Sequence, residues 1–187
     1  KFKISASGLE NVDTDNDDNW LEFKRATKVF VGSLNGWKDE FNAPVVIESS
    51  ENAPQILITG SNIGIVGRKT GDLNYGIVIN NNTSAPAIRL SEDVRGKLLI
   101  SKNVKIENVK IDGNDIQNDG IQSNYWQTFN IRIENNYFKN IAGSALRIAG
   151  SEYYIKNNNF YNCTTILRSD LNNRDGRFYE NKFCNDE

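Results

Sequence analysis

The chain contains no histidine among its 187 residues. Histidine is the side chain whose charge changes near neutral pH, so its absence excludes a His-based triad, a histidine general base and a histidine metal ligand. Any catalysis must use carboxylates, lysine, arginine, tyrosine or a bound cation. Methionine is also absent and the chain begins at Lys1, which we expect of a mature product whose leader was removed.

Cysteine is scarce, with only Cys163 and Cys184. Two interpretations fit this pair. The residues are either two buried thiols or a disulfide that joins neighbouring turns near the end of the chain, and a disulfide would suit an extracytoplasmic protein. The sequence does not decide between them. No Cys-x-x-Cys or Cys/His spacing occurs, so a structural zinc site is not expected.

Strong charge and long apolar runs are missing as well. The net charge is −2 with both signs mixed along the chain, so no basic field indicates a nucleic-acid partner. No apolar run approaches the length of roughly 18 residues that a membrane span needs. One domain with a continuous core suits this chain length.

What the chain does have is an internal repeat. One short motif of the form apolar–charged–Asn recurs at intervals of roughly 20–27 residues. Its copies are Ile106-Glu107-Asn108, Ile133-Glu134-Asn135, Ile155-Lys156-Asn157 and Tyr179-Glu180-Asn181. A second register lies between them, with copies Gly120-Ile121-Gln122, Ala145-Leu146-Arg147 and Ile166-Leu167-Arg168. Each period therefore holds about three short strands.

The strands of this repeat alternate. In Phe129–Glu134 the apolar side chains occupy every second position and polar ones lie between them. Strands of this kind at this spacing predict an all-β solenoid, in which successive turns pair at about 4.8 Å and inward side chains stack in like columns.

The repeated asparagines then have a physical role. Asn tolerates the left-handed conformation that a sharp bend between strands requires. Its amide can also hydrogen-bond to an Asn above and below, so that a buried column satisfies its own polar groups. We predict an asparagine ladder made of Asn108, Asn135, Asn157 and Asn181. Four exposed turn residues are the alternative.

The pattern I-x-N-x-x-[IF], together with Asn118–Gln122 (NDGIQ) opening a strand, resembles the right-handed parallel β-helix superfamily that includes pectate lyases. The resemblance covers roughly residues 45–183. It implies the fold but hardly the activity, because the superfamily contains lyases, hydrolases, epimerases, tailspikes and adhesins. Within this span the paired Asp-Asp and Gly-His-Gly motifs of polygalacturonases and the histidine-dependent lyase motifs are absent.

We expect two segments along the chain: residues 1–44 as an N-terminal segment with a cap, and residues 45–187 as one continuous parallel β-helix. Residues 20–30 have apolar side chains at helical intervals after a capping-box-like start, which predicts a short amphipathic helix that closes the solenoid. A strand over Val29–Val31 competes with it. In the first half we expect strands at 45–47, 55–59, 63–66, 77–79, 87–90 and 97–101, and a loop at 68–74.

The outward face is where the resemblance places binding and catalytic sites. Outward columns are expected for Gln122, Arg147 and Arg168, for Lys105 and Arg132, and for Glu107, Glu134, Lys156 and Glu180. Stacked arginines can bind sugar carboxylates, or a lyase can use Arg147 or Arg168 as its base beside a cation held by Asp119 or Asp170. Ordinary exposed charge is the alternative. Tyr125 and Trp126 follow Gln122 and can stack on sugar rings.

An acidic segment near the start gives the one cofactor hypothesis. Asp13, Asp15 and Asp17 alternate as in a calcium loop, but the glycine and the final glutamate of such a loop are missing. A solvated acidic segment before a helix is the alternative.

These features lead to three functional hypotheses. We expect a secreted or cell-surface β-helix that binds an extended, acidic polysaccharide along one face. A metal-assisted polysaccharide lyase is the enzymatic alternative. A structural or adhesin-like module, as part of a longer chain or an oligomer, is the third.

Overall fold

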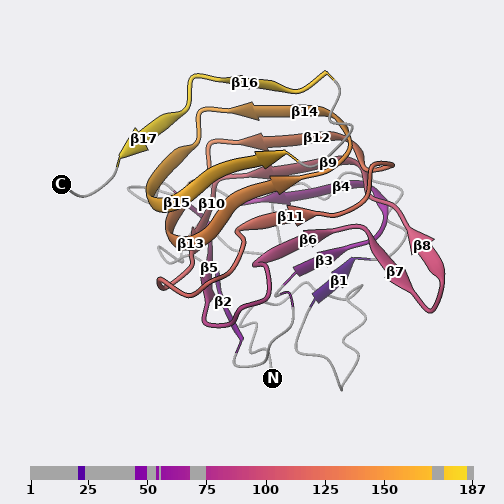
Figure 1. The fold of residues 1–187 in the computed structure, drawn as a ribbon, viewed down its shortest axis with the longest axis horizontal. Helices are drawn as coiled ribbons and strands as arrows, with labels where there is room; N and C mark the ends of the chain where they lie inside the picture. Colours follow the sequence, from indigo (N-terminus) through magenta and orange to yellow (C-terminus); the bar gives the residue numbers. More distant parts are fainter. Residues whose placement is uncertain are drawn as a thin grey trace, which may run out of the picture.

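The structure is a computed structural model, and it describes residues 21–23, 45–49, 54, 56–67, 75–169 and 175–184. This part of the chain is all β, and its strands belong mostly to parallel sheets. None of the described residues forms a helix, so none forms one that is long and apolar enough to cross a membrane. The parallel strands lie in three stacks, and strands far apart in sequence lie side by side (Figure 1).

The three stacks are defined by their pairing. Stack 1 contains β2 (Val45–Ser49), β5 (Ile77–Asn81), β10 (Val109–Asp112), the first halves of β13 (Tyr137–Ile148) and β15 (Asn159–Ser169), and β17 (Lys182–Cys184). Stack 2 contains β1 (Leu21–Phe23), β3 (Ile56–Ile58), β6 (Ile88–Leu90), β11 (Ile121–Ser123) and the second halves of β13 and β15. Stack 3 contains β4 (Ser61–Val66), β9 (Lys102–Glu107), β12 (Phe129–Glu134), β14 (Ser151–Lys156) and β16 (Arg177–Tyr179).

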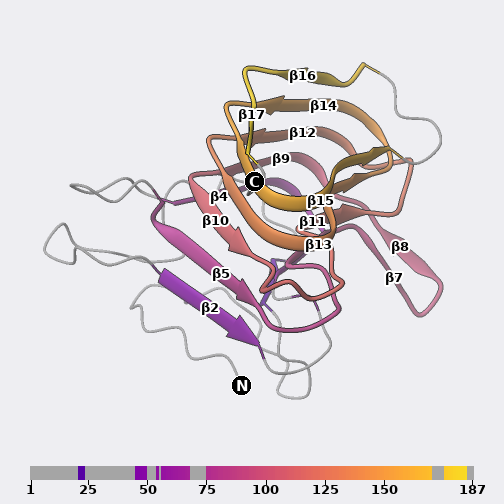
Figure 2. The ribbon, with the colours of Figure 1, turned by 60° about the vertical axis from the view of Figure 1, so that its left-hand side comes forward.

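From β4 onward, apart from one hairpin, the chain visits the stacks in a fixed order: stack 3, then stack 1, then stack 2. We call three such consecutive strands a rung, so β9, β10 and β11 form one rung. Figure 2 shows the rungs following one another with their strands in parallel. An antiparallel hairpin interrupts this order between β6 and β9. It consists of β7 (Glu92–Val94) and β8 (Lys97–Leu99) and projects away from the stacks (Figure 1).

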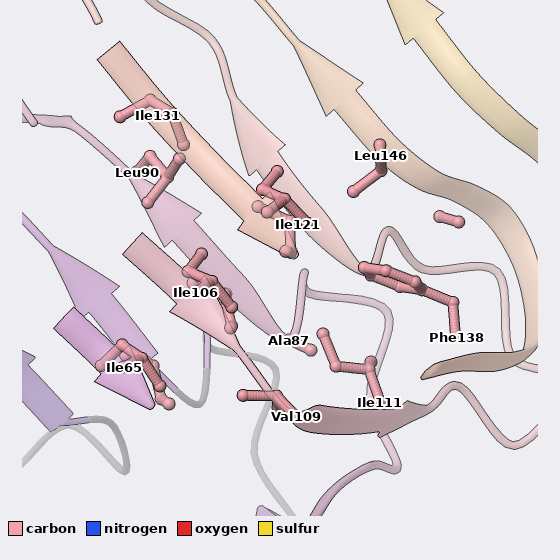
Figure 3. Packing of buried hydrophobic residues seen from close by; sticks show 14 of the residues in the cluster. Ile65, Ala87, Leu90, Ile106, Val109, Ile111, Ile121, Ile131, Phe138 and Leu146 are labelled. Atoms are coloured by element: carbon pink, nitrogen blue, oxygen red, sulfur yellow. The ribbon is translucent and has the colours of Figure 1, made fainter. Parts of the chain in front are cut away.

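The apolar positions of each strand face a single core, as the alternation in the sequence predicts. The inward residues come from all three stacks, for example Ile65, Leu90 and Ile111, and they point toward one another (Figure 3). Inward side chains form columns of like residues. Phe138 and Phe160 stack with their ring centroids 5.0 Å apart, and Phe183 continues this column at 5.7 Å from Phe160. Offset stacking adds to the burial of apolar area that stabilises the fold.

An asparagine ladder is present, but one residue further along than predicted. Its members are Asn136, Asn158 and Asn181. The Nδ2 atom of Asn136 donates to Asn158 Oδ1 at 3.0 Å, and Asn158 Nδ2 donates to Asn181 Oδ1 at 3.0 Å. Asn136 and Asn158 are fully buried. Of the predicted members, only Asn181 belongs to the hydrogen-bonded column.

The other three predicted residues make the bend itself. Asn108, Asn135 and Asn157 have φ values of 54°, 57° and 54°, which confirms the left-handed conformation expected of them. In the last rung this position is Glu180, with φ 54°, and not Asn181. Two consecutive positions therefore have different roles. The first adopts the left-handed conformation of the bend, and the second directs its amide into the core.

The predicted helix over residues 20–30 is not shown. Its described residues, Leu21–Phe23, form strand β1, which pairs in parallel with β3. Pairing with β3 supplies the backbone hydrogen bonds that a helix would otherwise supply locally, which explains the difference. The remaining residues of the predicted helix, the competing strand at 29–31 and the predicted loop at 68–74 lie outside the described residues.

Candidate functional site

A pocket of about 630 Å³ lies where the chain bends from stack 1 to stack 2. Apart from Pro54, which precedes β3, its walls come from four successive rungs. The loop after β5 supplies residues 84–86, and the loop after β10 supplies residues 117–119. The bends in the middle of β13 and β15 supply residues 142–144 and 164–165. A shift in strand register between Ile141 and Ser144 marks the bend in β13.

A column of polar side chains lines this pocket on the stack 2 side. Gln122 pairs with Arg147 across neighbouring strands, and Arg147 pairs with Arg168, so the predicted column of these three residues is confirmed. The structure adds Arg89, which pairs with Gln122 one rung earlier. All four residues line the pocket. Adjacent strands lie about 4.8 Å apart, so the column presents one polar group at each such step.

Asp119 contacts two members of this column, Gln122 and Arg147. Its Oδ2 atom is 3.9 Å from an Arg147 guanidinium nitrogen and accepts a hydrogen bond from Gln122 Nε2 at 2.9 Å. Its Oδ1 atom accepts a hydrogen bond from the backbone N–H of Ser144 at 2.9 Å. Each carboxylate oxygen therefore accepts one hydrogen bond from the protein, and these bonds fix the orientation of Asp119.

Gln122 links the groups of the column to one another. Its side-chain Oε1 accepts hydrogen bonds from Arg89 Nε at 3.2 Å and from Asn124 Nδ2 at 3.4 Å, while its Nε2 donates to Asp119. Gln122 is only 7% exposed. Since an amide both donates and accepts, Gln122 can hold a guanidinium on one side and a carboxylate on the other.

At the end of the column nearest the N-terminus, Arg89 also contacts the hairpin. Its NH1 atom lies 3.0 Å from Glu92 Oε2, and both side chains are about one quarter exposed, at 27% and 26%. Glu92 is the first residue of β7, so the ion pair connects the column to the base of the projecting hairpin. Solvent screening keeps the contribution of such a pair to stability small.

The position of Asp119 depends on a close approach at Gly143. A Cβ atom added at Gly143 would collide with the backbone carbonyl of Asn118 and would lie 2.9 Å from Asp119 Oδ1. Backbone hydrogen bonds hold the same segment on both sides: Ala87 N donates to Asp119 O at 3.0 Å, and Gly120 N donates to Ser144 O at 2.9 Å. Glycine is therefore required at 143 for steric reasons.

Asn118 closes the inner wall of the pocket. It is 3% exposed, and its Nδ2 atom faces the carbonyl oxygens of Thr83 and Gly113 at 3.1 Å each and that of Asn81 at 3.5 Å. Three surrounding acceptors fix the orientation of this amide. Its Oδ1 atom is buried and has no hydrogen-bond partner in the protein.

Other residues predicted to bind a ligand lie elsewhere. Arg132 belongs to stack 3, where it pairs with Lys105 as predicted and lies exposed over the Tyr154 ring at 5.2 Å from the ring centroid. Tyr125 and Trp126 lie between β11 and β12, with Trp126 64% exposed. None of these three residues lines the pocket. Arg132 is thus separated from Arg147 and Arg168, because stack 3 and stack 2 face different directions.

The predicted column of Glu107, Glu134, Lys156 and Glu180 is correct for its first three members and wrong for the fourth. Glu134 pairs with Glu107 and with Lys156, but Lys156 pairs with Tyr179. The error has the same origin as that in the asparagine ladder, since Ile155 aligns with Phe178 and not with Tyr179.

The metal hypotheses gain no support. Within the described ranges, no three His, Cys, Asp or Glu side chains gather where they could hold a metal ion. Asp13, Asp15 and Asp17 of the predicted calcium segment, and Asp170, lie outside the described residues. Cys163 and Cys184 are free thiols, the first buried and the second exposed. Burial raises the pKa of the Cys163 thiol.

Comparisons of the chain with protein-family models, with curated proteins and with solved structures give no match. The pocket is therefore interpreted from its own geometry.

Proposed function

We propose that this protein is a secreted or cell-surface right-handed parallel β-helix that binds an extended acidic polysaccharide. One observation carries the binding proposal. Arg89, Gln122, Arg147 and Arg168 come from four consecutive strands of stack 2 and line a single pocket of about 630 Å³.

The fold part of the proposal is supported by connectivity. Strands of all three stacks pair in parallel, and the chain enters the stacks in the same order in successive rungs. Connections between parallel strands of one sheet are right-handed in about 98% of cases. Since stability in such a repeat comes from contacts between neighbouring rungs, a continuous core of the kind seen here is expected.

The ligand class follows from the chemistry of the column. A guanidinium group presents a planar fork of N–H donors that matches a carboxylate, and the pair is charge-assisted. Gln122 and Ser144 add groups that can both donate to and accept from hydroxyls. Because the cationic groups are spread over several rungs and not gathered at one point, they suit a chain with repeated acidic units better than a single small acid.

Binding without catalysis suits this site better than a lyase reaction. Arginine stays protonated under ordinary conditions, so Arg147 and Arg168 are better placed to bind a carboxylate than to remove a proton. Both oxygens of Asp119 already accept hydrogen bonds from the protein. The lyase and the structural module are the outcomes that the following experiment separates.

The test is a glycan array followed by calorimetric titration of each acidic glycan bound, run beside an ultraviolet assay for the unsaturated ends that a lyase produces. The decisive variant is Arg147→Gln/Arg168→Gln, and Arg132→Gln on stack 3 is the matched control. Charged hydrogen bonds contribute roughly 1.5–3 kcal/mol each, so the double variant should lose about 100-fold or more in affinity.

The control variant should bind like the wild type. Wild-type protein that binds no acidic glycan, or a double variant that keeps its affinity, would contradict the binding proposal. Unsaturated products would favour the lyase over the binding protein. No binding and no product in either assay would favour the structural module.

A further inference from the structure

A negative charge interrupts the arginine column. Asp119 contacts both Gln122 and Arg147, with its Oδ2 atom 2.9 Å from Gln122 Nε2 and 3.9 Å from Arg147 NH1. The hydrogen bond from the Ser144 N–H holds its other oxygen, and the backbone of the same segment pairs with the rungs on both sides. Asp119 is thus a fixed part of the pocket wall.

The order of charges along the column then has a pattern. Arg89 lies one rung below Gln122, and Arg147 and Arg168 lie one and two rungs above it. The rung of Gln122 carries no cation of its own in the column and brings the Asp119 carboxylate in its place. Arg89 and Arg147 are therefore separated by one position at which the ionisable group is an anion, while Arg147 and Arg168 are direct neighbours.

A ligand with a carboxylate on every unit would bring one of them against Asp119. Like charges placed side by side in an interface cost several kcal/mol. A carboxylate oxygen and an amide instead accept hydrogen bonds from hydroxyl or N–H groups of an uncharged sugar. The middle position therefore selects a neutral unit, while the arginine positions on either side select acidic ones.

We infer that the ligand is a mixed polysaccharide in which acidic units are separated by uncharged ones, and not a homopolymer of uronic acid. This inference rests on the proposed function, because it names the kind of acidic polysaccharide that the same pocket takes. It makes Asp119 a specificity-determining residue.

The first test uses the wild-type protein alone. Its affinity is measured by calorimetry for a hyaluronan hexasaccharide, in which uronic acids alternate with N-acetylglucosamine, and for a galacturonate hexasaccharide. The first probe carries half the charge of the second. We nevertheless expect it to bind about tenfold or more tightly, because the homopolymer places a carboxylate against Asp119.

The second test is Asp119→Asn, which keeps the size of the side chain and an oxygen for the Ser144 N–H. Its matched control is Asp112→Asn in stack 1. The Asp112 side chain is 13% exposed and lies 3.9 Å from Lys139 Nζ, against 16% and 3.9 Å for Asp119 and Arg147. We expect Asp119→Asn to raise the affinity for galacturonate about tenfold and to leave or lower that for hyaluronan, while the control changes neither.

The outcomes separate the two proposals. Equal or tighter binding of galacturonate by the wild type overturns this inference and leaves the proposed function intact. If the wild type binds neither hexasaccharide nor any other acidic glycan, both this inference and the proposed function are wrong. If Asp119→Asn does not fold, as judged by its thermal unfolding, the wild-type comparison of the two hexasaccharides still decides.

Discussion

Asn158 Oδ1 accepts two hydrogen bonds from Asn136, one from the backbone N–H at 2.9 Å and one from the side-chain Nδ2 at 3.0 Å. The Nδ2 atom of Asn158 donates to the Ile133 carbonyl at 2.8 Å and to Asn181 Oδ1 at 3.0 Å. One fully buried amide thus satisfies polar groups of the rungs on both sides of it. Burying an amide in an apolar core is costly unless such partners exist.

Replacing Asn158 with alanine should lower the free energy of unfolding by about 2–4 kcal/mol, because the Ile133 carbonyl and the Asn136 amide would lose their partners while remaining buried. Urea denaturation measures the change. Asn157→Gly is the control, since glycine adopts the left-handed conformation of that exposed neighbour freely and should change stability by under about 1 kcal/mol. A larger effect at 157 than at 158 would return the ladder to the predicted register.

Gly143→Ala should destabilise the protein and, if the proposed function holds, also weaken glycan binding. The new methyl group would overlap the Asn118 carbonyl and crowd Asp119, so the segment must shift, at a cost of about 1–3 kcal/mol. Thermal unfolding and glycan titration measure the two effects. Thr164→Ala, at an exposed pocket position in the next rung, should leave stability nearly unchanged. Unchanged stability of Gly143→Ala would mean that the loop carrying Asn118 can move away from the new methyl group at little cost in free energy.

Tyr153 makes stability depend on pH in the alkaline range. The side chain is buried, its hydroxyl donates to the Ala149 carbonyl at 2.7 Å, and burial raises the pKa of Tyr153 above its ordinary value of about 10. The folded state therefore holds this proton more tightly than the unfolded state. The contribution is complete below about pH 10 and is lost as the pH rises from there toward the folded pKa.

Tyr153→Phe should cost about 1 kcal/mol at neutral pH through the lost hydrogen bond. Because phenylalanine does not ionise, the stability gap between wild type and variant should shrink above about pH 10. Denaturation at a series of pH values up to the alkaline limit measures this gap. A gap that stays constant across the series would show that Tyr153 loses its proton at the same pH in the folded and unfolded states.

The two cysteines should differ in reactivity. Cys184 is exposed and free, whereas Cys163 is a buried thiol whose burial raises its pKa. Since thiolates are the reactive species, iodoacetamide should label one thiol per native chain, at Cys184, and two after unfolding. Peptide mass mapping identifies the sites. Absence of labelling in the unfolded, unreduced chain would show a disulfide instead.

The sequence correctly predicts an all-β chain and most strands of the described residues, because alternation and repeat spacing both follow from the geometry of paired strands. The predicted register of the asparagine ladder is wrong by one residue where two polar residues are adjacent. Asn135-Asn136 and Asn157-Asn158 each allow two registers. The last repeat has a single asparagine, Asn181, and matching it to the first asparagine of each pair shifts the prediction by one residue. The neighbouring strands settle the register, because Phe178 and not Tyr179 pairs with Ile155.

The site was predicted in part. The column of Gln122, Arg147 and Arg168 follows from repeat spacing, but Arg89 was missed. The hairpin of β7 and β8 inserts extra residues before the next rung, so the spacing gives no signal there. The pattern Ile88-Arg89-Leu90, which matches Leu146-Arg147-Ile148, could have revealed it. The contacts of Asp119 could not, since they depend on how a loop folds against the bend in β13.

The column also bears on how such a protein can change through evolution. Its four members come from four different turns of the chain, one residue each, and alternate with core residues on strands that would form without them. Exchanging one of these side chains leaves the inward neighbours in place. If the proposed function holds, ligand preference can therefore change one side chain at a time while the core stays the same, and duplication of a whole rung would lengthen the column by about 4.8 Å.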